Sequence, residues 1–281
     1  MLRRFLRKQT LASFDYQWRE LPEADALLSD EWFRSNVTRI IAGELLCLKP
    51  EWFKGKRILD AGCGTGRWTV GLLELGADVT AVDFSDAALA QVKEHVAEHC
   101  TAEQQARLRT QQADLLRLPA DLAAQRFDCV FSFGVLHHTG DTRAALRGVA
   151  RVVADDGVIF LYLYGQESVN RFAWARLGAE RLLLAPLPFK LKQRAIHLLR
   201  PGSDVHHAFD LLSPTINDRH TYSEVRRWLV ESGFPDVERT IDHTELFLRG
   251  ARRPEAIAPF ITRPPEPPYW FERYSAPQSD R

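Results

Sequence analysis

Two hydrophobic periodicities alternate along the middle of this 281-residue chain. Short apolar runs with the length and composition of buried strands lie at residues 57–60, 78–83, 107–112, 128–132 and 158–164. Between them, apolar residues recur at helical spacing over residues 67–75, 87–99 and 142–153. Strands that alternate with helices of this length predict parallel strands joined by crossover helices. We therefore expect an α/β core over residues 53–164.

The alternation stops after residue 164, and we predict an inserted helical cap over residues 165–213. This stretch contains helical segments interrupted at Pro186, Pro188 and Pro201, and it is long for a connection within one sheet. It carries seven basic residues against two acidic ones between residues 165 and 203. A basic, leucine-rich cap suits an anionic or lipid-like acceptor, but the pattern is also typical of a helix pair whose charges face water. The sequence leaves both interpretations open.

The pattern of a sheet returns over residues 214–250, with a helix at 223–232 that stops at Gly233 and two strands near 237–242 and 244–249. The last segment, residues 251–281, is rich in proline and is not expected to form a regular core element. We expect this tail to be disordered or to pack over the cap through Tyr269, Trp270 and Phe271.

The amino-acid composition limits the kinds of molecule that this chain is expected to bind. The chain has 37 basic and 37 acidic residues, so no net charge favours nucleic acid. No apolar run approaches the roughly 20 residues that a membrane helix needs. The basic segment at residues 1–8 fits either weak association with an anionic lipid surface or a solvated helix turn. The four cysteines lack paired spacing, so we predict neither a metal site nor disulfides, and a reducing cytoplasm fits.

A glycine-rich turn follows the first apolar strand and precedes a helix. Its glycines are Gly62, Gly64 and Gly66. Glycine leaves no Cβ between the backbone and a ligand, so the turn predicts a cofactor site. A dinucleotide-binding fingerprint would place its third glycine at position 67, which is Arg67. This spacing weakens the interpretation as an NAD site.

The turn resembles the first motif of class I S-adenosylmethionine (SAM) dependent methyltransferases, Asp/Glu-x-Gly-x-Gly-x-Gly. Asp60 and the three glycines match it. A second acid, Asp83, ends the next strand nineteen residues after Gly64, close to the roughly 20-residue spacing of a ribose-binding carboxylate. The resemblance implies that SAM is the cofactor and that Asp83 accepts hydrogen bonds from both ribose hydroxyls.

Two later segments carry the same resemblance. Residues 111–119 are similar to the adenine-binding segment, in which Asp114 would bind the exocyclic amine and the Leu115 backbone would meet the ring. Residues 126–139 are similar to the fourth strand and its following loop. The resemblance also implies cofactor contacts for Cys63, Phe84 and Ser132.

The fold that this resemblance implies is a Rossmann-like, doubly wound, seven-stranded sheet with an antiparallel final hairpin. Residues 53–164 would form the SAM-binding core, 165–213 a helical cap that carries the acceptor site, and 214–250 the end of the sheet. Residues 1–52 are similar to an N-terminal helical lid, in which Tyr16 and Trp18 would cover the methionine end of the cofactor or the acceptor.

The reaction that the resemblance implies is transfer of a methyl group to a small molecule, with oxygen as the expected acceptor atom. His137 and His138 follow the fourth strand, where a neutral imidazole could act as a base or shape the acceptor pocket. The alternatives are a non-catalytic SAM-binding module, or an NAD(P)-dependent enzyme on a related fold. The glycine spacing and the absence of a Tyr-x-x-x-Lys pair count against the last of these.

Overall fold

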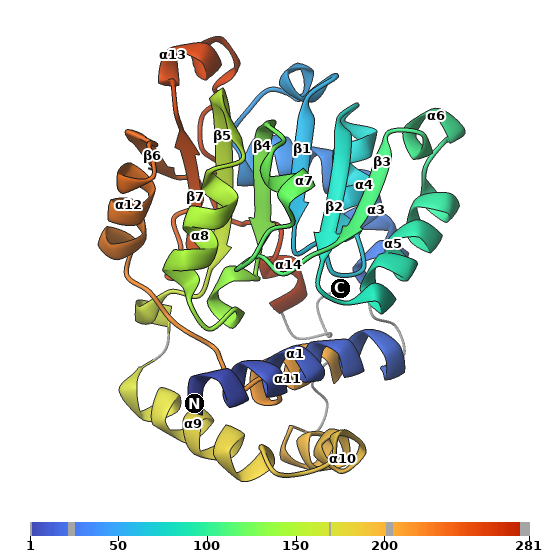
Figure 1. Cartoon of the computed structure of the whole chain (residues 1–281), viewed down its shortest axis with the longest axis vertical. Helices are drawn as coiled ribbons and strands as arrows, with labels where there is room; N and C mark the ends of the chain where they lie inside the picture. The colour runs from blue at the N-terminus through green and yellow to red at the C-terminus, as the bar shows by residue number, and fades with distance from the viewer. Residues whose placement is uncertain (1, 22–25, 169, 201–204, 276–281) are drawn as a thin grey trace.

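The computed structural model describes residues 2–21, 26–168, 170–200 and 205–275. Its centre is a seven-stranded sheet of order β3-β2-β1-β4-β5-β7-β6 (Figure 1). The first five strands are parallel, whereas β7 runs antiparallel to both β5 and β6. The predicted Rossmann-like sheet with an antiparallel final hairpin is therefore confirmed. The strands are β1 (Arg57–Ala61), β2 (Asp78–Asp83), β3 (Leu108–Gln112), β4 (Phe127–Phe133), β5 (Val153–Leu163), β6 (Asp236–Arg239) and β7 (Leu246–Ala251).

The helices of the core follow the predicted order, with boundaries that agree to within a few residues. Helices α4 (Arg67–Glu74), α5 (Asp86–His99), α8 (Thr142–Ala150) and α12 (Tyr222–Glu231) flank the sheet. Shorter helical segments are α2 (Ala26–Ser29), η2 (Pro50–Phe53), α6 (Ala102–Gln105), α7 (Ala120–Ala123), η3 (Leu136–His138), η4 (Gln166–Ser168), α13 (Pro254–Ile257), η5 (Ala258–Phe260) and α14 (Glu272–Ser275).

Strand β5 differs from its prediction, because it begins at Val153 rather than at 158. Val153 pairs with Phe127, and the register then shifts so that Val158 pairs with Cys129. Residues 154–157 thus form an irregularity inside the strand.

Alternation along each strand divides the core between the two faces of the sheet. In β1, Ile58 packs on one face and Leu59 on the other, and in β4 Phe131 and Val130 divide in the same way. One face is covered by α8 and α12. The other is covered by α4, α5, α3 (Glu31–Arg39) and the π-helical segment η1 (Ile40–Leu45).

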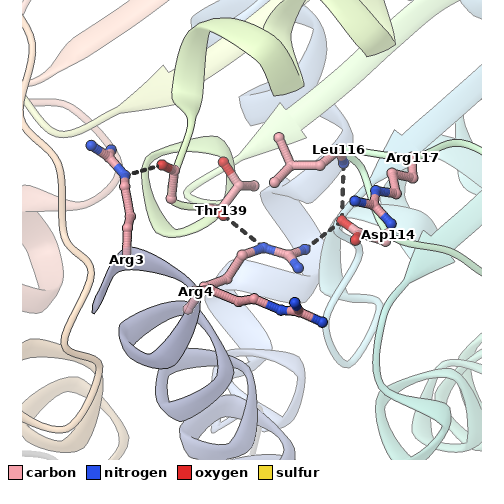
Figure 2. Close-up of a pocket in the computed structure, with 8 residues that line it drawn as sticks. Arg3, Arg4, Asp114, Leu116, Arg117 and Thr139 are labelled. Carbon is pink, nitrogen blue, oxygen red and sulfur yellow. Dashed lines mark hydrogen bonds and ion pairs between the residues drawn. The ribbon is translucent and has the colours of Figure 1, made fainter. Parts of the chain in front are cut away.

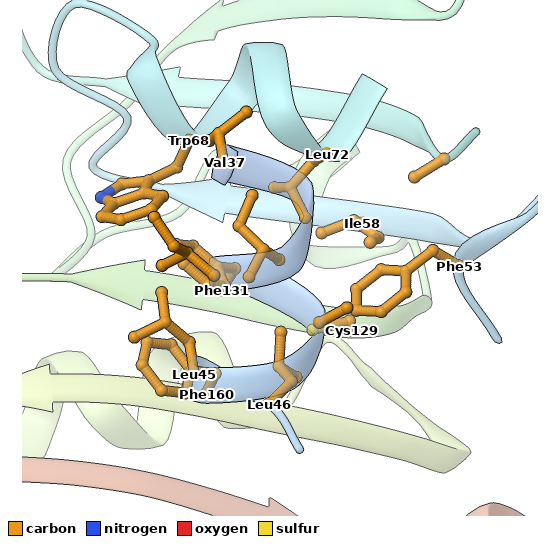
Figure 3. Close-up of a cluster of buried hydrophobic side chains, with 14 of the residues drawn as sticks. Val37, Leu45, Leu46, Phe53, Ile58, Trp68, Leu72, Cys129, Phe131 and Phe160 are labelled. Atoms are coloured by element: carbon orange, nitrogen blue, oxygen red, sulfur yellow. The ribbon is translucent and has the colours of Figure 1, made fainter. Parts of the chain in front are cut away.

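The segment 31–48 differs from its predicted place in a lid. Phe33, Val37 and Leu45 have no exposed surface and belong to the same buried cluster as sheet residues such as Phe131. Figure 3 shows Val37, Leu45 and Phe131 in this cluster. Gly71 on α4 allows this approach, because a Cβ there would lie 2.7 Å from the Val37 side chain. A mainly apolar face packs α3 and η1 on the sheet, so the cover over the strand ends comes from the first helix.

The proline-rich tail also differs from its prediction, because its aromatic residues enter the core rather than pack over the cap. Trp270 is 7% exposed, and its ring centroid lies 5.4 Å from that of Trp68 and 5.8 Å from that of Phe33. The backbone N–H of Trp270 donates to Glu44. Tyr269 is buried in the same cluster. Residues 276–281, the end of the predicted tail, lie outside the described residues.

The predicted cap is helical, with α9 (Arg171–Leu184), α10 (Phe189–Leu199) and α11 (Val205–Leu212). It packs together with α1 (Leu2–Glu20) below the sheet in Figure 1. Phe209 and Leu212 of α11 are fully buried in a separate small cluster. A hydrogen bond of 2.6 Å between Ser13 of α1 and Ser213 joins α1 to the end of the cap.

Candidate active site

The polar residues singled out by the sequence gather where the parallel strands end. The glycine turn follows β1, Asp83 ends β2, Asp114 follows β3, and the two histidines follow β4. This carboxyl edge of a parallel sheet is where open α/β folds bind their ligands. Helix α1 lies across the same edge (Figure 1).

The glycine turn and Asp83 form one unit. The backbone N–H of Gly64 donates to the Asp83 carboxylate at 3.1 Å, and that of Ser85 donates at 3.0 Å. Gly62 has φ +84°, and a Cβ there would lie 2.5 Å from the Val135 side chain. No other residue fits that position, so the turn is held between the Val135 loop and the acid. Burial raises the pKa of Asp83 to about 6.

Asp60 lies beneath the turn and is 1% exposed. Its carboxylate accepts a 2.6 Å hydrogen bond from the Thr69 hydroxyl, and burial raises its pKa to about 7. Cys63 in the turn is also buried, and burial raises the pKa of its thiol well above the usual value. The thiol is therefore protonated and not a nucleophile.

Asp114 is joined to α1 by an ion pair that sequence analysis missed. Arg7 donates to Asp114 at 2.6 Å and to the Thr139 carbonyl at 2.9 Å. Asp114 and Thr139 line the pocket drawn in Figure 2. The Leu116 N–H donates to the same carboxylate. The basic pattern of residues 1–8 was the only available signal for Arg7. A cavity of about 420 Å³ opens beside this pair, and it is lined by Arg3, Arg4, Arg7, Asp114, Leu116, Arg117, Thr139 and Gly140.

The side chains of Trp18 and Tyr16, both predicted for the lid, face different parts of the structure. The ring of Trp18 lies over the glycine turn, since a Cβ on Gly64 would be 3.4 Å from it. Tyr16 faces the cap, where it stacks on Phe189 at 5.1 Å and donates to Gln193. Tyr16 thus contacts the predicted cap rather than the glycine turn, and its predicted role toward the cofactor or acceptor stays a prediction. Residues three to four apart lie on one helix face, whereas residues two apart diverge.

Three further candidates are placed as follows. The Ser132 hydroxyl donates to the Ala61 carbonyl at 2.9 Å, which ties β4 to β1. Leu115 is 6% exposed and its side chain packs into the core. Phe84 is half-buried directly after Asp83, and its carbonyl accepts from Gln112.

The histidines are more deeply buried than a surface base would be, with His137 0% and His138 5% exposed. His138 Nδ1 lies 2.8 Å from the Ile216 carbonyl, whereas its Nε2 and both nitrogens of His137 have no partner among the described residues. Each unpaired buried group costs about 1–3 kcal/mol. Burial lowers the pKa of both rings, so both are neutral at pH 7.

A polar cluster from the cap and the following loop surrounds these rings. The Tyr164 ring centroid lies 4.0 Å from that of His137, and its hydroxyl donates to Asp210 at 3.1 Å. Arg219 lies over Tyr164 and pairs with Glu245 at 3.5 Å. Sequence analysis named none of these residues, because they are spread over more than 80 positions with no motif.

The described residues include no cluster of three or more His, Cys, Asp or Glu able to hold a metal ion. No described helix has the length and apolar content needed to cross a bilayer.

These groups fit SAM. The glycine turn exposes backbone beside Asp83. The backbone N–H groups of Gly64, Ser85 and Phe84 bond to that carboxylate, and because its two oxygens have about four lone-pair sites, capacity for a further hydrogen bond remains. The edge thus combines the carboxylates of Asp83 and Asp114 with two buried, neutral imidazoles.

The comparisons with known proteins agree with a SAM-dependent methyltransferase. Residues 58–157 match the family described as "Methyltransferase domain". A ubiquinone biosynthesis O-methyltransferase of Alkalilimnicola ehrlichii is 37% identical over 131 residues, 46% of this chain and 50% of that protein. Its counterpart in Pseudomonas aeruginosa (strain UCBPP-PA14) is 30% identical over 178 residues, 58% of this chain and 70% of that protein. The match thus spans half of the first relative's length and more of the second's.

A solved structure shows the same fold over most of the chain. Magnesium protoporphyrin IX methyltransferase from Synechocystis PCC 6803, solved with bound SAM, has a TM-score of 0.51 at 16% identity. The superposition covers 89% of this chain and 97% of that one. The chain belongs to the class I SAM-dependent methyltransferases, and its cofactor is SAM.

Proposed function

We propose that this chain methylates an oxygen atom of a small molecule. The observation that carries the proposal is the contact of the glycine turn with Asp83, because it builds the cofactor cradle at the sheet edge that also holds the histidines. The names of the curated relatives, O-methyltransferases of ubiquinone biosynthesis, support oxygen as the methylated atom.

We assign the cofactor contacts as follows. Asp83 binds the ribose hydroxyls, Asp114 and the Leu115 backbone face the adenine, and the glycine turn lies along the methionine part. Trp18 closes this end from α1. Asp60, Cys63 and Ser132 support the turn from beneath, since their polar groups are directed into the fold.

Bound at Asp83 and the glycine turn, SAM would supply a methyl carbon on a positively charged sulfur; the acceptor oxygen would form a bond to that carbon as the carbon–sulfur bond breaks and its electron pair stays on sulfur. The protein's part is mainly alignment and exclusion of water, since proximity alone contributes several kcal/mol. His138 is neutral, and its Nε2 has no hydrogen-bond partner in the part of the chain that the structure describes, so it is suited to accept a proton or hydrogen bond from the acceptor. His137 shapes the pocket beside Tyr164.

Calorimetric titration with SAM and S-adenosylhomocysteine (SAH) tests the cofactor site. We expect the wild type to bind both and Asp83→Ala to lose about 10- to 100-fold in affinity, because hydrogen bonds to a charged group are lost. Asp78→Ala is the matched control, since Asp78 is exposed at the other end of the same strand. Absence of wild-type binding, with NAD tested beside SAM, would refute the proposal.

Methyl transfer is then followed with radiolabelled SAM against phenols, carboxylic acids and amines. Label in an ether or ester product supports oxygen as the acceptor, and label on nitrogen alone contradicts it. A cytoplasmic location, and the absence of nucleic acid among the partners, stay predictions from the sequence.

A further inference from the structure

Most of the large hydrophobic side chains that this protein leaves exposed lie on two helices of the cap. Nine such residues are exposed in the described part of the chain, and six of them belong to α9 and α10: Phe172, Leu182, Leu183, Leu191, Leu198 and Leu199. Phe172 is 91% exposed and Leu198 is 80% exposed, so these side chains project from the surface instead of lying at the edge of the core. Large apolar side chains gathered in this way mark an interaction surface.

The exposed residues of α9 form one face of the helix. They lie at positions 172, 175, 176, 179, 182 and 183, a spacing of three or four residues that places them along one side. Leu177 and Leu184 lie on the other side and are buried in the small cap cluster. Apart from Arg176, the exposed face of α9 consists of alanine, leucine and phenylalanine.

Helix α10 repeats this arrangement with more charge. Its exposed residues include positions 190, 191, 194, 197 and 198, whereas Ile196 on the other side is buried. Both α9 and α10 contact α11. In Figure 1 the two helices lie on the far side of α1 and α11 from the sheet. Their exposed faces, which we call the outer cap face, therefore point away from the rest of the protein.

The charges of the outer cap face are basic. Arg176 is 66% exposed, and Lys190 and Arg194 are exposed on α10. Glu180 is the only acid in residues 171–199. Its side chain is 16% exposed and lies 2.8 Å from Arg200 and 3.6 Å from Arg176. Exposed leucines beside lysine and arginine on a helix are typical of surfaces that lie on anionic lipid bilayers.

A cavity of about 630 Å³ opens at the α10 part of this face. Its lining includes Lys190, Arg194 and Leu198, together with Arg200 and with Glu20 of α1. The three cations outnumber the acid, and lysine and arginine are the side chains that bind phosphate groups. The cavity is therefore suited to the phosphate of a lipid head group.

Two other arrangements fit these observations less well. A second copy of this chain would bring two copies of the same basic face together, and like charges oppose association. The basic segment at residues 1–8 is the other candidate for a lipid surface, but two of its arginines are engaged. Arg3 pairs with Asp218 at 3.0 Å, and Arg7 pairs with Asp114 at 2.6 Å.

We propose that the outer cap face docks on the surface of an anionic phospholipid bilayer. Phe172 and the exposed leucines enter the interface between head groups and acyl chains, while Arg176, Lys190 and Arg194 lie at the level of the lipid phosphates. The protein rests on the bilayer and does not span it. This inference is independent of the proposed methyl transfer, because it uses no residue of the cofactor site.

The test is flotation of the full chain with vesicles over a range of lipid concentrations. One set of vesicles is phosphatidylcholine alone, and the other is equal parts phosphatidylcholine and phosphatidylglycerol. We expect wild type to bind the anionic vesicles about tenfold or more tightly than the neutral ones. Binding should weaken as the salt concentration rises, because salt screens the attraction between basic side chains and lipid phosphates.

Two paired variants remove apolar side chains from the outer cap face. They are Leu182→Gln with Leu183→Gln, and Leu191→Gln with Leu198→Gln. We expect each pair to weaken binding to anionic vesicles about tenfold or more, because less apolar surface enters the interface. Val230→Gln is the matched control, since Val230 is 43% exposed on α12 and lies outside the cap.

A third pair, Lys190→Gln with Arg194→Gln, removes charge and should weaken binding about tenfold. Its matched control is Arg226→Gln with Arg227→Gln, two exposed arginines of α12. The thermal melt and the SAH affinity of every variant report whether the fold and the cofactor site are intact.

Three results would overturn the proposal. The first is a wild type that does not float with anionic vesicles, or that binds neutral vesicles equally well. The second is unchanged binding in the folded leucine variants, and the third is loss of binding in Phe5→Gln alone, which would place the lipid contact on α1. Light scattering addresses the second copy: a dimer that the leucine variants dissociate, without vesicle binding, would assign the outer cap face to self-association. Loss of SAM and SAH binding by wild type would refute the methyltransferase function and leave this inference standing.

Discussion

Replacing Asp60 with asparagine tests the electrostatics beneath the cofactor turn. Asp60 is 1% exposed, accepts one hydrogen bond from Thr69, and has its pKa raised by burial from 3.8 to about 7. Asparagine keeps an oxygen that can accept from Thr69 but carries no charge. The variant therefore removes the cost of burying a carboxylate and keeps the hydrogen bond.

The magnitude follows from linkage between protonation and folding. A carboxyl whose folded pKa lies above its unfolded pKa stabilises the fold fully below pH 3.8, and this contribution is lost as the pH rises through about 7. The shift of about three units corresponds to about 4 kcal/mol at pH 8, at 1.36 kcal/mol per unit. Allowing for relaxation around the site, we expect Asp60→Asn to be about 2–4 kcal/mol more stable than wild type at pH 8.

The assay is thermal unfolding of both proteins from pH 5 to pH 8.5, without cofactor. We expect the melting temperature of Asp60→Asn to exceed that of wild type by about 4–10 °C at pH 8 and by much less at pH 5. Asp156→Asn, 65% exposed, is the control and should shift the midpoint little at either pH. A variant less stable than wild type at pH 8, or a difference independent of pH, would refute the reasoning.

Three other expectations can be checked with the same methods. Gly62→Ala should lower SAH affinity at least about tenfold and destabilise the fold, because its Cβ would lie 2.5 Å from a valine side chain at φ +84°; unchanged titration curves would contradict this. Trp270→Ala should lower the free energy of unfolding measured in urea by about 3–5 kcal/mol, because the ring packs in the core. A loss as small as that of an exposed side chain would show that the tail lies outside the core. His137→Asn should flatten the loss of stability below pH 6.5, since a buried ring with lowered pKa stabilises only while neutral; an unchanged acid limb would refute its burial as the cause.

The cofactor half of the site was readable from the sequence because its geometry is local. Gly62, Gly64 and Gly66 lie in one turn, and Asp83 meets that turn only because consecutive strands of a parallel sheet pair side by side. Hydrophobic periodicity fixed the order of strands and helices for the same reason, since alternation along a strand assigns each side chain to one face.

The parts that the sequence did not reveal depend on contacts between distant segments. Arg7 pairs with Asp114, which lies 107 positions away in the sequence. Trp270 packs in the core, although the proline-rich sequence around it does not predict a buried position. Tyr16 and Trp18 had the same apparent role until the helix orientation separated them.

The sequence by itself therefore predicted the succession of strands and helices and the glycine turn, because short-range spacing encodes a turn and its neighbouring strands. Its resemblance to class I SAM-dependent methyltransferases added the class, the cofactor and the antiparallel final hairpin. Only the tertiary structure decided which residues gather at the two histidines. Tyr164, Asp210 and Arg219 come from the end of β5, from α11 and from the loop that follows it, and no periodicity links them to the histidines. Their common place follows from how the cap packs on α1 and the sheet edge, which is a property of side-chain packing over the whole fold.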